Sequence, residues 1–111
     1  MKVAYVFSSN RSYRILSTMI LPQIEEGRHG AEVAGMFFFE DNAFMLVQGD
    51  AVAERLKKLM DQKKIQLLMA CDQCAYERDI DKKLVDGARI GCFPDLYGAL
   101  GPAGVEHVIT L

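Results

Sequence analysis

Five short apolar runs alternate with helical patterns from one end of the chain to the other. The runs cover residues 3–7, 32–39, 65–70, 88–93 and 105–110. Such runs are typical of strands buried on both faces of a sheet, and parallel strands need right-handed helical crossovers. Residues 1–111 are therefore predicted to form one doubly wound α/β domain, with a mostly parallel five-stranded sheet in a flavodoxin-like three-layer sandwich.

The helical segments carry their own start and stop signals. Asp50 is expected to cap the helix that follows it, because its carboxylate can accept hydrogen bonds from the first backbone amides. Pro22 lacks a backbone donor and is expected to kink or shorten the first helix, and Gly101-Pro102 is expected to end the last one. Residues 72–85 are predicted to be helical only in one or two short pieces.

Composition argues against several classes of function. Half of the 111 residues are hydrophobic, so the chain can bury one core without a metal or a disulfide. The net charge is −2 and no basic stripe is present, so no nucleic-acid partner is expected. No apolar run approaches the ~20 residues that span a bilayer, so no membrane association is expected. Three cysteines in such a chain suit a reducing compartment, and a cytoplasmic location is expected.

Cys71 and Cys74 follow the third apolar run, where a polar stretch begins. Ligand sites of open α/β sheets lie at the carboxyl ends of the strands, and the amides of a helix that starts at residue 72 would stabilise a thiolate on Cys71. Cys74 lies one helical turn further on, so it can form a disulfide with Cys71, resolve a persulfide or simply pack. An inert buried cysteine is the alternative for Cys71, and packing is the favoured role of Cys92.

The loops after four parallel strands converge on one edge of a sheet, so we expect a shared crevice in which Cys71 is partly exposed. Its predicted lining comprises Ser8, Ser9, Asn10 and Arg11, the segment from Asp41 and Asn42 to Ala43, the segment from Cys71 to Cys74, and Cys92.

Two arginines are candidates for contact with a negative charge. The loop from Ser8 to Arg11 offers hydroxyls, backbone amides and a guanidinium, which suit an anion, although a capped helix start explains it equally well. Arg11 is the candidate for balancing charge on Cys71. Arg78 can hold an anionic sulfur or a carboxylate, and a solvated arginine is at least as good an interpretation.

Four features of the chain occur together in order. They are a first strand with a Ser/Asn-rich loop, Asp41-Asn42-Ala43 after the second strand, Cys71 followed seven residues later by Arg78, and Asp95-Leu96-Tyr97 before the last strand. In this order they resemble the DsrE-like proteins, which include small subunits of bacterial sulfur-relay complexes, over nearly the whole chain. The resemblance implies that Cys71 carries a persulfide, and Cys74 matches a second cysteine of some relatives. The chain departs from the family at Asp79, where a Gly usually follows the Arg.

Several functions are compatible with these residues. The first is a sulfurtransferase-like carrier that holds sulfane sulfur on Cys71 and exchanges it with donor and acceptor proteins, without a cofactor or metal. The second is a thiol-disulfide oxidoreductase that uses Cys71 and Cys74. A metal module built from Cys71, Cys74, Cys92 and Asp95 is the third, and a flavin or nucleotide binder is the fourth.

Two apolar runs, Met36 to Phe39 and Phe44 to Val47, flank the acidic turn at residues 40–42. They exceed what one small core easily covers, so part of this region is expected to contact another subunit. The alternative is a central strand covered on both faces. The resemblance favours association, as a homotrimer or a homohexamer.

Overall fold

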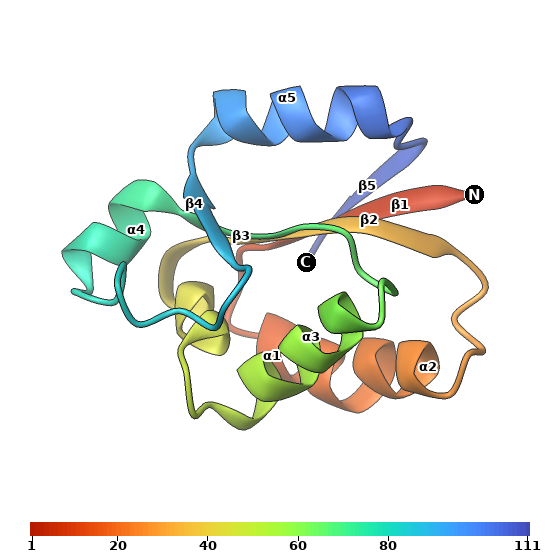
Figure 1. Cartoon of the computed structure of the whole chain (residues 1–111), viewed down its shortest axis with the longest axis horizontal. Helices are drawn as coiled ribbons and strands as arrows, with labels where there is room; N and C mark the ends of the chain where they lie inside the picture. Colours follow the sequence, from red (N-terminus) through yellow and green to blue (C-terminus); the bar gives the residue numbers. More distant parts are fainter.

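The computed structural model describes residues 1–111 as five parallel strands with helices on both faces of the sheet. The strand order is β4-β3-β2-β1-β5. Helices α1, α2 and α3 cover one face, and α5 alone covers the other (Figure 1). The predicted fold class is confirmed.

The elements follow one another in the expected alternation. Their bounds are β1 Lys2–Phe7, α1 Ser12–Ile15, η1 Leu16–Ile20, α2 Leu21–Glu25, β2 Glu32–Phe38, η2 Glu40–Leu46, α3 Ala51–Asp61, β3 Leu68–Cys71, α4 Asp72–Glu77, β4 Arg89–Gly91, α5 Phe93–Ala103 and β5 His107–Thr110.

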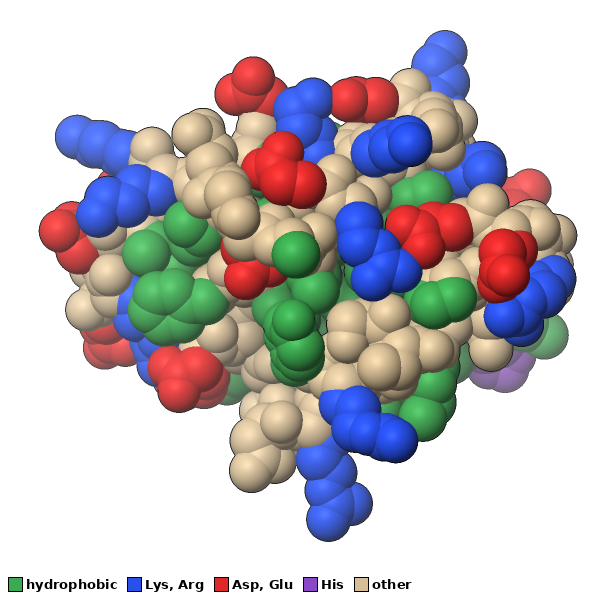
Figure 2. Space-filling model, turned by 90° about the horizontal axis from the view of Figure 1, so that it is seen from below, with side chains coloured by type: hydrophobic (Ala, Val, Ile, Leu, Met, Phe, Trp, Pro, Cys, Tyr) green, Lys and Arg blue, Asp and Glu red, His purple; other side chains and the backbone are tan.

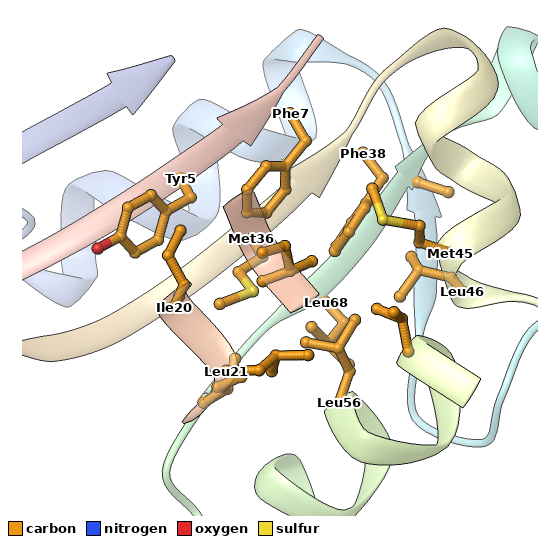
Figure 3. Close-up of a cluster of buried hydrophobic side chains, with 14 of the residues drawn as sticks. Tyr5, Phe7, Ile20, Leu21, Met36, Phe38, Met45, Leu46, Leu56 and Leu68 are labelled. Carbon is orange, nitrogen blue, oxygen red and sulfur yellow. The ribbon is translucent and has the colours of Figure 1, made fainter. Parts of the chain in front are cut away.

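The central strands β2 and β3 send alternate side chains to opposite faces of the sheet. Met36, Phe38 and Leu68 point into the larger core, under α1, α2 and α3 (Figure 3). Phe37 and Met69 belong to a smaller cluster on the α5 face. All five are at most 1% exposed, and each stabilises the fold by roughly 1.5–3 kcal/mol through burial.

The first helix continues past Pro22 and ends at Glu25, so the expected shortening is wrong. It contains a π-helical segment, η1, directly before the proline. The Leu21 amide donates to the carbonyl of Leu16, five residues back. This wider turn lets the helix accommodate a residue that has no amide of its own.

The last helix also differs from its prediction. Helix α5 continues through Gly101 and Pro102 to Ala103 and ends where Gly104 adopts a left-handed φ of 73°. Pro102 stands in the final turn, where one lost hydrogen bond costs little. The predicted cap is confirmed, because Asp50 Oδ1 accepts hydrogen bonds from the amides of Val52 and Ala53.

The apolar region from residue 36 to residue 47 lies almost wholly inside this chain. Met36, Phe37 and Phe38 are buried between the two helical layers, and Met45 and Leu46 are at most 3% exposed. Phe44 is the exception, because it is 45% exposed. Most of the region is therefore covered within one chain. The alternative, a central strand covered on both faces, is the observed arrangement.

The face formed by α1, α2 and α3 carries charges of both signs side by side (Figure 2). Lys57 pairs with Asp61 at 2.8 Å, and Arg28 pairs with Glu26 at 2.7 Å. None of the helices combines the length and the apolar character that a membrane span requires.

Asp79 has a left-handed φ of 54°, a conformation that glycine adopts without the steric cost of a side chain. We expect Asp79→Gly to raise the free energy of unfolding by up to about 1 kcal/mol, because glycine meets no steric cost there. The control Asp81→Gly, at a position without positive φ, should not stabilise the protein. Urea unfolding measures both, and a clear loss of stability in Asp79→Gly would contradict the argument.

Candidate functional site

Cys71 is the last residue of β3 and directly precedes α4. It pairs in register with Gly91 of β4, and its side chain packs with Phe37, Met69 and Leu96 on the α5 face. Only 6% of Cys71 is exposed. The expectation of a partly exposed Cys71 is therefore wrong, because α5 covers this side of the sheet.

Helix α5 approaches the sheet closely because position 91 has no side chain. A Cβ at Gly91 would lie 2.9 Å from the Cβ of Asp95 and 2.9 Å from the sulfur of Met69. A larger residue would force the first turn of α5 away from β4. The cover over Cys71 thus depends on this glycine.

Cys74 lies in α4, is 4% exposed and is hydrogen-bonded to Cys71 through its thiol. The backbone amide of Glu40 donates to the Cys74 sulfur at 3.1 Å. Burial, and then the hydrogen bond with Cys71, raise the pKa of Cys74 to about 11, against the lowering effect of the Glu40 amide. Cys74 therefore keeps its proton at neutral pH and is the donor toward Cys71. The contact between the Glu40 amide and Cys74 could not be predicted from the sequence, because every residue except proline has a backbone amide.

Cys92 is the most exposed of the three cysteines and caps α5. Its sulfur accepts a hydrogen bond from the amide of Asp95, and its own amide donates to Asp95 Oδ2 at 2.8 Å. Cys92 and Asp95 thus form reciprocal hydrogen bonds that cap the start of α5. No three His, Cys, Asp or Glu side chains are grouped as metal ligands, so the metal module has no ligand set here.

The loop from Ser8 to Ser12 directs its donors at one atom of the main chain. The carbonyl oxygen of Leu111 accepts from the amides of Ser8 at 2.7 Å and Ser9 at 3.2 Å. It also accepts from the hydroxyls of Ser8 at 3.2 Å and Ser12 at 3.0 Å. The hydroxyls and amides that were expected to hold an anion thus donate to Leu111, the residue that follows β5. No local pattern of the sequence reveals this long-range contact.

Asn10 and Arg11 face a different hollow from the cysteines. Together with Arg14, Ile15 and Met19 they line a space of about 580 Å³ beside the first helix. Strand β2 lies between β1, which precedes this loop, and β3, which carries Cys71. The structure gives no contact between Arg11 and the cysteines.

Asp41 and Asn42 lie in η2, and Arg78 directly follows α4, which packs beside η2. Arg78 Nε donates to Asp41 Oδ1 at 2.8 Å, and Arg78 Nη2 donates to Glu40 Oε2 at 3.0 Å. The side-chain amide of Asn42 donates to the carbonyl of Phe39 at 3.1 Å. Arg78 therefore holds carboxylates of η2, which is one of the two contacts expected of it, and its guanidinium is not directed at a sulfur.

Three solved structures share this fold over the full length of the chain. YchN from E. coli is 18% identical, with a TM-score of 0.71 and coverage of 99% of this chain and 97% of that one. MTH1491 from Methanobacterium thermoautotrophicum is 13% identical, with a TM-score of 0.72 and coverage of 99% and 98%. BT1422 from Bacteroides thetaiotaomicron is 11% identical, with a TM-score of 0.67 and coverage of 99% and 94%.

The last two of these structures are described as proteins of unknown function. No protein-family model matches the chain, and no curated protein matches it. At these identities the likeness establishes the fold alone. This chain is thus similar in architecture to YchN and to two conserved proteins without an assigned role.

The raised pKa of Cys74 predicts a loss of stability at alkaline pH. The unfolded thiol releases its proton near pH 9.0, whereas the folded thiol keeps it until about 11. Between these values the unfolded state binds fewer protons, so the free energy of unfolding falls as the pH rises. Cys74→Ala should remove part of this fall, and Cys92→Ala should leave it in place. Urea unfolding across this pH range checks both, and identical slopes for wild type and Cys74→Ala would contradict the assignment.

Proposed function

We propose that this protein carries sulfane sulfur as a persulfide on Cys71 and passes it to the thiol of a partner protein. The observation that carries the proposal is the buried pair of thiols at the end of β3, where the Cys74 thiol interacts with the Cys71 sulfur and the Glu40 amide donates to the Cys74 sulfur. A persulfide anion is stabilised by such donors where little water reaches it. The resemblance to the DsrE-like proteins supports the same role, since their persulfide cysteine matches Cys71.

The transfer needs two exchange steps. The Cys71 thiolate attacks the outer sulfur of a donor persulfide, which forms the Cys71 persulfide and releases the donor as a thiolate. The thiolate of an acceptor protein then attacks the outer sulfur on Cys71. The sulfur–sulfur bond breaks, its electrons return to Cys71 as a thiolate, and the acceptor leaves as a persulfide.

Access to Cys71 requires a local opening of its cover. Leu96 packs against the cysteines, and it is the one buried residue of α5. Phe93, in the first turn of this helix, is 43% exposed. The other contacts of α5 with the sheet are made by partly exposed side chains, among them Phe93, whose ring lies 5.8 Å from that of Phe37, and Leu100. Displacement of its first turn is the proposed route for partner proteins.

A second candidate function is thiol-disulfide exchange by the same pair. It is favoured by the hydrogen-bonded contact between the thiols of Cys71 and Cys74. Oxidation would join the two sulfurs and pass two electrons and two protons to an oxidised partner. Both candidates use Cys71, and they differ in whether Cys74 is indispensable.

We predict that Cys71→Ser abolishes sulfur loading, whereas Cys74→Ser and Cys92→Ser still load. Intact-mass spectrometry after incubation with a sulfane-sulfur donor measures an adduct of one sulfur atom. Persistence of the adduct in Cys71→Ser would refute the carrier. If both Cys71 and Cys74 are required and the wild type cycles between dithiol and disulfide, the oxidoreductase is the correct function.

Association into a homotrimer or a homohexamer stays a prediction of the resemblance. Large apolar side chains exposed on this chain include Phe93 and Tyr97 on α5 and Val108 and Ile109 on β5. These residues, together with Phe44 in the region from 36 to 47, which is 45% exposed, are available to a second copy. Light scattering at micromolar concentration should give a mass of three or six chains, and a monomer would contradict the prediction.

A further inference from the structure

The amide of Glu40 reaches the Cys74 sulfur from an unusual backbone conformation. Glu40 has a φ of 56°, in the left-handed region that residues with long side chains seldom adopt. A return to negative φ would change the direction of the peptide that carries this amide relative to η2. Such a conformation persists only where the surroundings hold it.

Arg78 is the side chain that holds this segment. Its guanidinium donates to Glu40 Oε2 at 3.0 Å and to Asp41 Oδ1 at 2.8 Å. Its third nitrogen, Nη1, donates to the carbonyl of Cys74 at 3.2 Å. The planar guanidinium of Arg78 therefore holds Glu40 and Asp41, at the start of η2, against the backbone of Cys74.

The two carboxylates of this clamp are exposed to water, at 55% for Glu40 and 86% for Asp41, so the ion pairs add little to stability. Their main effect is geometric. We propose that Arg78 is a positioning residue for the cysteine pair, which acts by holding the Glu40 amide on the sulfur of Cys74. The inference rests on the proposed function for the role of the thiols, but its test requires no loading with sulfane sulfur.

Loss of the clamp should release Glu40 to negative φ and withdraw its amide from the sulfur of Cys74. That amide lowers the pKa of Cys74, so its withdrawal favours the protonated thiol. The pH at which Cys74 reacts as a thiolate should therefore rise.

The chain offers a matched control in Arg55. Arg55 donates to Glu25 through Nε at 3.0 Å and Nη2 at 2.6 Å, and to the carbonyl of Ser17 at 3.2 Å. It joins two elements with a comparable set of bonds, but on the face of the sheet opposite to the cysteines. Arg55→Gln therefore reproduces the loss of a clamp without touching the site.

The test is the pH profile of alkylation at Cys74, read by peptide mass spectrometry, together with hydrogen exchange of the Glu40 amide. Arg78→Gln should move the profile upward by about half a pH unit or more, roughly threefold less thiolate at a given pH, and speed the exchange. Arg78→Lys should do the same, because one ammonium cannot reproduce the fork. Arg55→Gln should leave both readouts unchanged.

A wild-type profile in Arg78→Lys would overturn the inference, since a positive charge without the forked guanidinium would then be enough to hold the Glu40 amide in place. An equal shift in Arg55→Gln would overturn it too, since general loosening would be the cause. If Arg78→Gln does not fold, Arg78→Lys against Arg55→Lys gives the same comparison. Failure of sulfur loading in the wild type would refute the proposed function and leave these readouts intact.

Discussion

Burial of β2 and β3 on both faces is the constraint on which the rest of this structure depends. Alternate side chains of a strand point to opposite faces, so Phe38 and Ala70 enter the larger core while Phe37 and Cys71 enter the smaller one. Register with Gly91 then fixes Cys71 beneath the first turn of α5. The chemistry of the site follows from this dry position, because buried thiols depend on protein donors rather than on water.

The site shows how neighbouring groups determine the chemistry of two similar thiols. Cys74 is buried, keeps its proton at neutral pH and accepts a hydrogen bond from the Glu40 amide, while Cys71 interacts with the Cys74 thiol. The donor from Glu40 is itself fixed by ion pairs at the exposed rim, through Arg78. Exposed charges of small energetic weight can thereby control a buried sulfur, because position rather than stability is what they contribute.

The sequence was sufficient to predict what depends on local pattern. Apolar runs predicted the five strands, and Asp50 predicted a helix start, because spacing and capping act within a few residues. Long-range contacts could not be assigned to particular partners in the same way. The exposure of Cys71 depends on α5, which lies over it from another part of the chain, and the partners of Arg78 lie 37 and 38 residues away. The donors of Ser8 and Ser12 are bound by Leu111, about a hundred residues further on.

The most direct test of this account locates the sulfur in the wild-type protein, where all three thiols compete. The protein is loaded with a sulfane-sulfur donor under native conditions, trapped with an alkylating agent and digested, and each cysteine peptide is sequenced by mass spectrometry. The account predicts an added sulfur on Cys71, although Cys92 is the more exposed thiol. Sulfur found on Cys92, with none on Cys71, would contradict it.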